Sequence, residues 1–216
     1  MQFFRRLFNR KARIPKQPLQ PTPYEVKHML GGIGEVQIES DRIRFLQYPF
    51  EPSVVFPANT LMASEIHSIC PDGYPPMIRV GEELIFISRV HHEALKAFAQ
   101  RNQLMEFTHT RNWNHLLEPF LDTEYTPDWD RKMTERLMTN GISPAEIRDL
   151  RTEVKELILA YNFDTGLMDW ANLGLSDVLA AVQKRYDRES FQRFFQRAME
   201  IELRQGPSVD PAELDR

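Results

Sequence analysis

The spacing of apolar residues changes near Pro127, and this change constrains the fold more than any other feature of the sequence. Before that proline, apolar and polar residues alternate in short runs, the pattern of strands that bury one face. After it, apolar residues recur every three or four positions, the pattern of amphipathic helices. We therefore expect an α+β fold. Residues 25–126 should form a β-rich domain that also contains one or two helices, and residues 127–206 a small all-α helical bundle.

Two hairpins are predicted in the β-rich region. Apolar residues alternate over 36–38 and again, in the opposite phase, over 43–45, with a polar turn between them. The runs 77–80 and 84–87 flank a Gly-Glu-Glu turn and form the second pair. The elements expected next are a helix over 92–102, a short strand over 104–108 and a helix over 113–121, which Pro119 ends or kinks.

The helical region carries start and stop signals for four helices. Asn140-Gly141 ends the first helix, and Ser143-Pro144-Ala145-Glu146 starts the second with a capping box. Ser176 is the expected N-cap of the third helix. The fourth carries a stripe of phenylalanines and precedes a polar tail at residues 207–216. Packing between these helices explains their apolar stripes without a partner.

Residues 1–24 differ from the rest of the chain in charge. They contain six of the 27 lysine and arginine residues and no acidic residue, so their net charge is +6. The rest of the chain keeps 21 basic against 31 acidic residues, a net charge of −10. An acidic body argues against a large nucleic-acid interface. The basic segment is the part that a polyanion would attract.

The same segment has the pattern of a basic amphipathic arm followed by a Pro-rich linker. Four prolines between residues 15 and 23 stop a helix and predict an extended linker. We expect the arm to bind an anionic membrane surface, with apolar side chains in the interface and arginines at the headgroups. Alternatively, its phenylalanines dock onto the protein's own body or onto a protein partner. The residues predicted to contact the membrane are Phe3, Phe4, Arg5, Arg6, Leu7, Phe8 and Arg10.

Cysteine usage and hydropathy indicate a reducing compartment. Cys70 is the single cysteine, so no intramolecular disulfide can form. No apolar run reaches the roughly 18 to 20 residues that span a bilayer. The basic N-terminus lacks the long apolar stretch and the cleavage site of a secretory signal. We expect a cytoplasmic protein that lies peripherally on the inner face of the membrane.

One group of side chains has the chemistry of metal ligands. Imidazole and carboxylate groups can hold zinc or iron and leave a position open for water, so a metal-dependent hydrolase is the alternative function. The spacing argues against it, because His-Glu-x-x-His is absent and adjacent histidines on a helix point about 100° apart. We expect no metal and no other cofactor. The residues of this alternative site are His91, His92, His109, His115 and Glu118.

No other motif predicts a catalytic residue. Asp164-Thr165-Gly166 matches the aspartic-protease triplet, but it lies between predicted helices instead of in a β-sheet loop. Gly31-Gly32-Ile33-Gly34 precedes a strand pattern, whereas a phosphate-binding loop precedes a helix. The sequence therefore favours a non-enzymatic binding or adaptor protein over an enzyme. Its expected partner is an unknown protein or an anionic lipid surface.

The order of two hairpins and a helix over residues 34–102 resembles bacterial pleckstrin-homology-like domains. This resemblance covers less than half of the chain, and the strand and helix expected at 104–121 depart from a minimal domain of that kind. It implies a scaffold that binds lipids or peptides, without an enzymatic activity. The segments that carry the resemblance are Gly34-Glu35-Val36-Gln37-Ile38, Asp41-Arg42-Ile43-Arg44-Phe45 and Ser64-Glu65-Ile66-His67-Ser68-Ile69.

Overall fold

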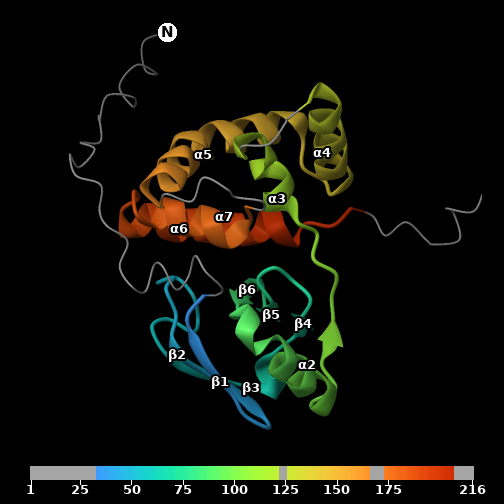
Figure 1. Cartoon of the computed structure of the whole chain (residues 1–216), viewed down its shortest axis with the longest axis vertical. Coiled ribbons are helices and arrows are strands. Elements are labelled where there is room, and N and C mark those ends of the chain that lie inside the picture. Colours follow the sequence, from blue (N-terminus) through green and yellow to red (C-terminus); the bar gives the residue numbers. More distant parts are fainter. Residues whose placement is uncertain (1–32, 122–125, 166–172, 207–216) are drawn as a thin grey trace, which may run out of the picture.

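The computed structural model describes the backbone of residues 33–121, 126–165 and 173–206, and it has the α+β fold that the sequence predicts. Figure 1 shows the β-sheets in one half of the molecule and most of the helices in the other. The last described strand ends at Glu106, and helices dominate from there on. Within the described ranges, no helix combines the length and apolarity needed to cross a membrane.

The first sheet is a three-stranded antiparallel meander. β1 (Glu35–Ile38), β2 (Arg42–Gln47) and β3 (Asn59–Met62) lie side by side in that order. Val36 and Phe45 are register partners across the first pair, and both are buried. This arrangement confirms the first predicted hairpin, because the change of phase between its strands keeps the apolar residues of both on one face.

The second sheet contains four strands in the order β6-β5-β4-β7. They are β4 (Ser68–Cys70), β5 (Met77–Val80), β6 (Glu83–Phe86) and β7 (Met105–Glu106). The β5–β6 pair confirms the second predicted hairpin. β7 runs parallel to β4, whereas the other pairs are antiparallel. The sequence predicts this last strand over 104–108, and its ladder with β4 is shorter than that.

Two helical elements connect the sheets to the bundle. After the 3₁₀ turn η2 (Arg89–His91), α2 (His92–Arg101) packs beside the sheets as the sequence predicts. α3 (Asn112–Leu117) runs into the 3₁₀ turn η3 (Glu118–Phe120). Pro119 explains the end of α3, because proline has no N–H for the next helical hydrogen bond.

Four further helices complete the fold. They are α4 (Pro127–Thr139), α5 (Pro144–Thr165), α6 (Leu175–Gln183) and α7 (Arg188–Leu203). Gly141 follows α4 with a positive φ of 81°, the left-handed conformation that ends many helices. α3 contacts all four of these helices, so it packs with the bundle although it precedes Pro127 in the chain. The division into two separable domains stays a prediction.

Hydrogen bonds at the helix starts confirm one predicted cap and correct another. The N–H of Glu146 donates to Ser143 Oγ (3.2 Å), as predicted for α5. Ser176 is not the N-cap of α6, because that helix begins at Leu175 and its N-cap is Gly174, two residues earlier than predicted. The carboxylate of Asp177 accepts a hydrogen bond from the Gly174 N–H (2.8 Å) and holds this start. Glycine is an acceptable N-cap residue, but its sequence signal is weaker than that of serine.

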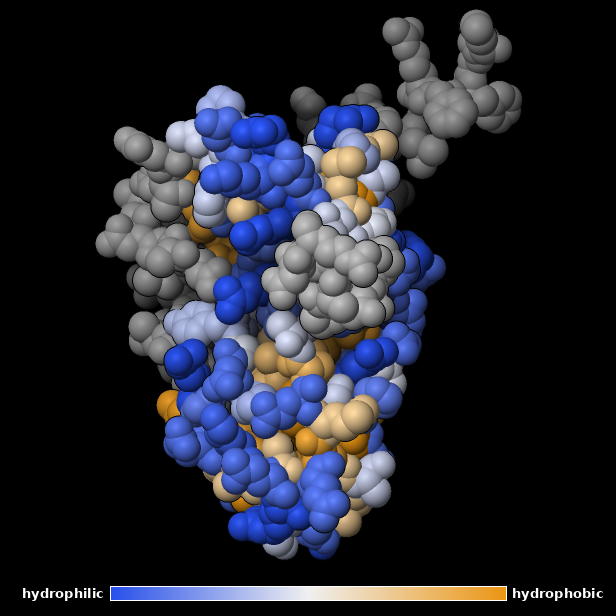
Figure 2. Space-filling view, turned by 90° about the vertical axis from the view of Figure 1, so that its right-hand side faces the viewer, coloured by the Kyte–Doolittle hydropathy of each residue, from blue (hydrophilic) through white to orange (hydrophobic). Residues whose placement is uncertain are grey.

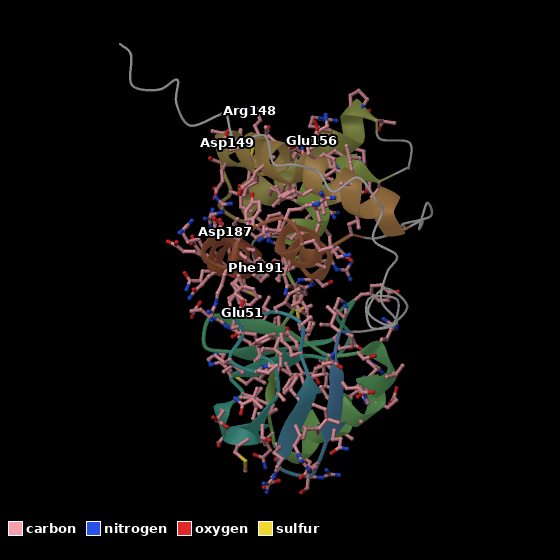
Figure 3. All side chains as sticks on the ribbon, turned by 90° about the vertical axis from the view of Figure 1, so that its left-hand side faces the viewer. Glu51, Arg148, Asp149, Glu156, Asp187 and Phe191 are labelled. Carbon is pink, nitrogen blue, oxygen red and sulfur yellow. The ribbon has the colours of Figure 1, made fainter. Side chains whose placement is uncertain are left out.

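α7 lies across the β-rich half, and the two halves share one hydrophobic core. The rings of Phe50 and Phe195 are 6.4 Å apart between centroids. At the rim of this contact, Arg188 Nε lies 2.7 Å from Glu51 Oε1. Figure 3 shows Glu51 beneath Phe191 at the start of α7, while the labelled side chains of α5 lie on the far side of the helices. The outer face of α5 is therefore a solvated charged surface.

Candidate binding site at a sheet edge

The structure does not bring the predicted metal ligands together. His92 Nε2 lies 2.8 Å from Asp72 Oδ1, and this hydrogen bond is the main reason that the pKa of His92 is raised. Glu118 Oε1 instead accepts a hydrogen bond from Trp129 Nε1 (2.9 Å). Among the described residues, no three His, Cys, Asp or Glu side chains form a group that could hold a metal ion. The hydrolase alternative thus has no supporting cluster.

The remaining predicted ligands lie in three different elements. His91 is in η2, His115 is in α3, and His109 lies in the connector between β7 and α3. Burial penalises the charged form of His115 and lowers its pKa. His109 Nε2 contacts Glu202 Oε1, and both atoms are buried without a further hydrogen-bond partner. Of the predicted ligands, only His109 therefore belongs to a buried ionisable pair.

Glu202 of α7 is the centre of a buried polar junction that the sequence interpretation missed. Its side chain is almost fully buried, and its Oε2 accepts a hydrogen bond from the Trp113 N–H (2.8 Å). Asn112 Nδ2 donates to the Ile201 carbonyl (2.7 Å), and Asn140 Nδ2 donates to Asn112 Oδ1 (2.7 Å). These bonds satisfy carbonyls at the end of α7 and fasten the start of α3 to it. The signal that the interpretation overlooked is the phenylalanine stripe of α7, because its helical spacing continues to residue 202 and so indicates that Glu202 is buried.

The segment before this junction, residues 105–109, lies along β4 for longer than the two-residue ladder of β7. Phe107 N–H donates to the Ile69 carbonyl (3.0 Å), and the N–H of His109 hydrogen-bonds to the Cys70 sulfur. Burial is the main reason that the pKa of the Cys70 thiol is raised, so the sulfur is an inert acceptor at neutral pH. The whole segment therefore forms the outermost strand of the second sheet. We call residues 105–109 the open edge.

Two residues of the open edge turn their backbone groups away from the sheet. Since alternate residues of a strand face the same neighbour, the N–H and C=O groups of Glu106 and Thr108 point away from β4. Both residues are exposed. In the described part of the chain, no hydrogen bond reaches either of these N–H groups. A row of alternating backbone donors and acceptors is thus available at this edge.

The opposite edge of the same sheet, β6, has its outward N–H groups occupied. Ile87 donates to the Pro76 carbonyl of the β5 side, so Leu84 and Phe86 face outward. Leu84 N–H donates to the sulfur of Met199 (3.4 Å) on α7. Phe86 N–H donates to the hydroxyl oxygen of Tyr48 (3.1 Å). Both donors are buried and occupied, so neither is free to pair with another strand.

One of the two edges of the first sheet, β3, is exposed, but its outward N–H groups are capped locally. The N–H of Ala63 donates to the β1–β2 turn, which leaves Thr60 and Met62 facing outward. Thr60 N–H donates to the side chain of Asn59 (2.8 Å), and Met62 N–H donates to the carboxylate of Glu65 (2.7 Å). Such capping is one way in which proteins prevent pairing at an edge.

A groove of about 560 Å³ opens at one end of the open edge. Its charged lining residue is Asp41, whose hydrogen bonds from Arg42 hold its pKa below the usual value. Figure 2 looks onto this side of the molecule and shows apolar residues on the surface of the β-rich half within a hydrophilic surround. The apolar side chains that line the groove include Met62, Ile66, Leu104 and Met105.

The residues predicted to bind a membrane lie outside the described ranges, because all seven fall between Phe3 and Arg10. The prediction that the arm binds a membrane therefore rests on the sequence alone. No family model, curated protein or solved structure matches this chain. The pleckstrin-homology-like resemblance stays a prediction, and the geometry of the described residues carries the functional argument.

Proposed function

We propose that this chain is a non-enzymatic adaptor protein that works peripherally at an anionic, cytoplasmic membrane face. The observation that carries the proposal is the separation of charge along the chain. Residues 1–24 have a net charge of +6 and all other residues together have −10. Anionic lipid repels an acidic body and attracts a basic segment, so the arm makes the membrane contact.

The strength expected of this contact suits reversible binding. Each lysine or arginine near an anionic bilayer contributes about 1 kcal/mol, and ordering the arm offsets part of that gain. The arm's phenylalanines and Leu7 add apolar area buried at the interface. An isolated helix of this length is marginal in water, so the arm acquires its helical form on the surface.

An adaptor also needs a binding surface on its body. The open edge and the adjoining groove supply one, because they combine unused backbone groups with apolar side chains at an exposed site. The metal-dependent hydrolase is not proposed further, because no group of described His, Cys, Asp or Glu residues could hold a metal ion, and His92, His109 and Glu118 contact other side chains.

The test is co-sedimentation of the full chain with vesicles of phosphatidylcholine alone or mixed with phosphatidylserine, at low and high salt. A variant that replaces three arm arginines with glutamine should lose most binding to the anionic vesicles. A control that removes three exposed basic residues of the body should bind like the unmodified chain. The two sets are Arg5, Arg6 and Arg10 in the arm, and Arg101, Lys132 and Lys155 in the body.

Two results would contradict the membrane proposal. One is equal sedimentation of the arm variant and the body control with anionic vesicles. The other is binding that does not weaken with salt, since exposed charges are screened over about 10 Å at 0.1 M ionic strength.

A further inference from the structure

We propose that the open edge, residues 105–109, takes up an extended segment of a partner protein, which adds as a new strand beside β7. This goes beyond the membrane contact of the arm and rests on different residues. The observation behind it is a contrast between three of the sheet edges, those at β6, β3 and β7. β6 and β3 have their outward N–H groups hydrogen-bonded, whereas those of Glu106 and Thr108 have no partner in the described part of the chain.

The geometry of the open edge suits an extended backbone better than a helix or a small molecule. Glu106 and Thr108 each present one donor and one acceptor, separated by the repeat of two residues along a strand. A second strand carries the matching groups at the same repeat. Each such hydrogen bond contributes about 0.5–1.5 kcal/mol net, so main-chain pairing alone gives weak binding.

The groove can add side-chain contacts to the main-chain hydrogen bonds of the added strand. Met105 belongs both to the open edge and to the groove lining, and its side chain is 64% exposed. A side chain of an added strand that faces the same way as Met105 can therefore enter the groove. The groove, of about 560 Å³, has room for such a side chain. Methionine surfaces adapt to different apolar shapes, so one or two bulky apolar side chains are expected there.

The charges at the site favour a basic partner segment. No lysine or arginine lines the groove, and the carboxylate of Asp41, its acidic lining residue, is already paired with Arg42. Glu106 adds an exposed carboxylate, which no ion pair in the described ranges occupies. The segment that fits is extended, has apolar residues at alternate positions, and carries lysine or arginine at its ends. Electrostatic complementarity of this kind contributes mainly to association rate and specificity.

The test uses the full chain and a synthetic heptapeptide of alternating valine and threonine with a lysine at each end. The first readout is amide hydrogen exchange of the full chain with and without peptide. We expect the amides of Glu106 and Thr108 to exchange quickly without peptide and to become at least tenfold slower with it. A peptide N-methylated at both its valines and its threonines should give no protection, because in either strand direction it cannot donate the main-chain hydrogen bonds.

A pair of substitutions at one position separates main-chain pairing from charge. Glu106→Pro removes an outward N–H that β4 does not use, so the sheet is retained and peptide affinity should fall at least tenfold. Glu106→Gln keeps the backbone donor, so affinity for the peptide should change by less than about threefold. Unchanged affinity for Glu106→Pro, with an unchanged melting temperature, would place the peptide elsewhere and overturn the proposal.

Other occupants of the edge are distinguished by the same exchange measurement. Protection of the two amides without peptide at every protein concentration would show that a segment of this chain already covers the edge. Protection that increases with protein concentration would show a second copy. Either result overturns a partner protein as the occupant, as does a lack of protection at millimolar peptide. The vesicle experiment on the arm is independent of all three outcomes.

Discussion

The two outer strands of the second sheet differ in whether their outward N–H groups are already hydrogen-bonded. At β6 the outward N–H groups of Leu84 and Phe86 are buried against Met199 and Tyr48. At the open edge, the corresponding groups of Glu106 and Thr108 are exposed and have no described partner. The fold thus uses one edge to attach its helical half and leaves the other accessible. This difference is the basis of the binding surface that we propose, which no sequence motif indicates.

The largest expected effect concerns the anchor at the end of the open edge. Glu202→Ala leaves His109 buried without its partner and removes the acceptor of the Trp113 N–H. We expect the free energy of unfolding to fall by about 1–3 kcal/mol for each of the two buried groups that lose their partner, so this variant should lose the most stability. Urea unfolding measures this.

Glu200→Ala is the matched control, since Glu200 is exposed on the same helix. It should change stability by no more than about 0.5 kcal/mol. Equal losses for the two variants would mean that the buried junction does not hold the connector.

The next effect concerns the covered edge. Tyr48→Phe removes the hydroxyl that accepts from the buried Phe86 N–H, and nothing in β5 can replace it. An unsatisfied buried donor costs about 1–3 kcal/mol. Tyr74→Phe, at an exposed tyrosine, should be nearly neutral. If thermal unfolding shows the same melting temperature for both variants, the hydroxyl does not secure β6.

The stability of the covered edge should depend on pH, because β6 begins with Glu83, whose carboxyl group is partly buried. Burial is the main reason that the pKa of Glu83 is raised, and its oxygens accept from the Ser53 hydroxyl and the Val54 N–H. The folded state therefore binds this proton more tightly than the unfolded state. Its contribution to stability is greatest below the ordinary pKa and declines as pH rises through the raised pKa.

Glu83→Gln removes this titration and keeps an oxygen acceptor. The stability of the variant relative to the unmodified chain should therefore increase as pH rises from below the ordinary pKa of glutamate through the raised pKa of Glu83. Urea unfolding across this pH range gives the difference. A difference that stays constant would mean that burial does not affect the titration of Glu83.

The smallest expected effect concerns the open edge itself. Proline is tolerated in an edge strand where its missing N–H faces solvent. Glu106→Pro should therefore change the free energy of unfolding by less than about 1 kcal/mol, within the range of most surface substitutions. Phe107→Pro is the contrasting variant, because it removes the hydrogen bond to the Ile69 carbonyl and a partly buried side chain. Similar losses for the two would contradict the assignment of which residues face β4.

Local patterns predict much of this fold, and the candidate site shows where they stop. The phase change between residues 36–38 and 43–45 predicts the first hairpin because its turn is short and its strands are adjacent in sequence. The burial of Glu202 follows from the spacing of the phenylalanines in α7, but its pairing with His109 joins segments far apart in the chain. The backbone of Glu106 is unpaired on one side because β7 is the last strand in the sheet order β6-β5-β4-β7. Local sequence patterns do not give this order, because it is set by packing of the whole chain.

Amide hydrogen exchange of the free, full-length protein at low concentration tests the central claim most directly, because it reports both edges of one sheet in a single measurement. The account predicts slow exchange at Leu84 and Phe86, whose N–H groups are hydrogen-bonded and buried, and slow exchange at Phe107. It predicts fast exchange at Glu106 and Thr108. Protection at Glu106 and Thr108 equal to that at Leu84 and Phe86 would show that the edge is already covered, and would contradict the account.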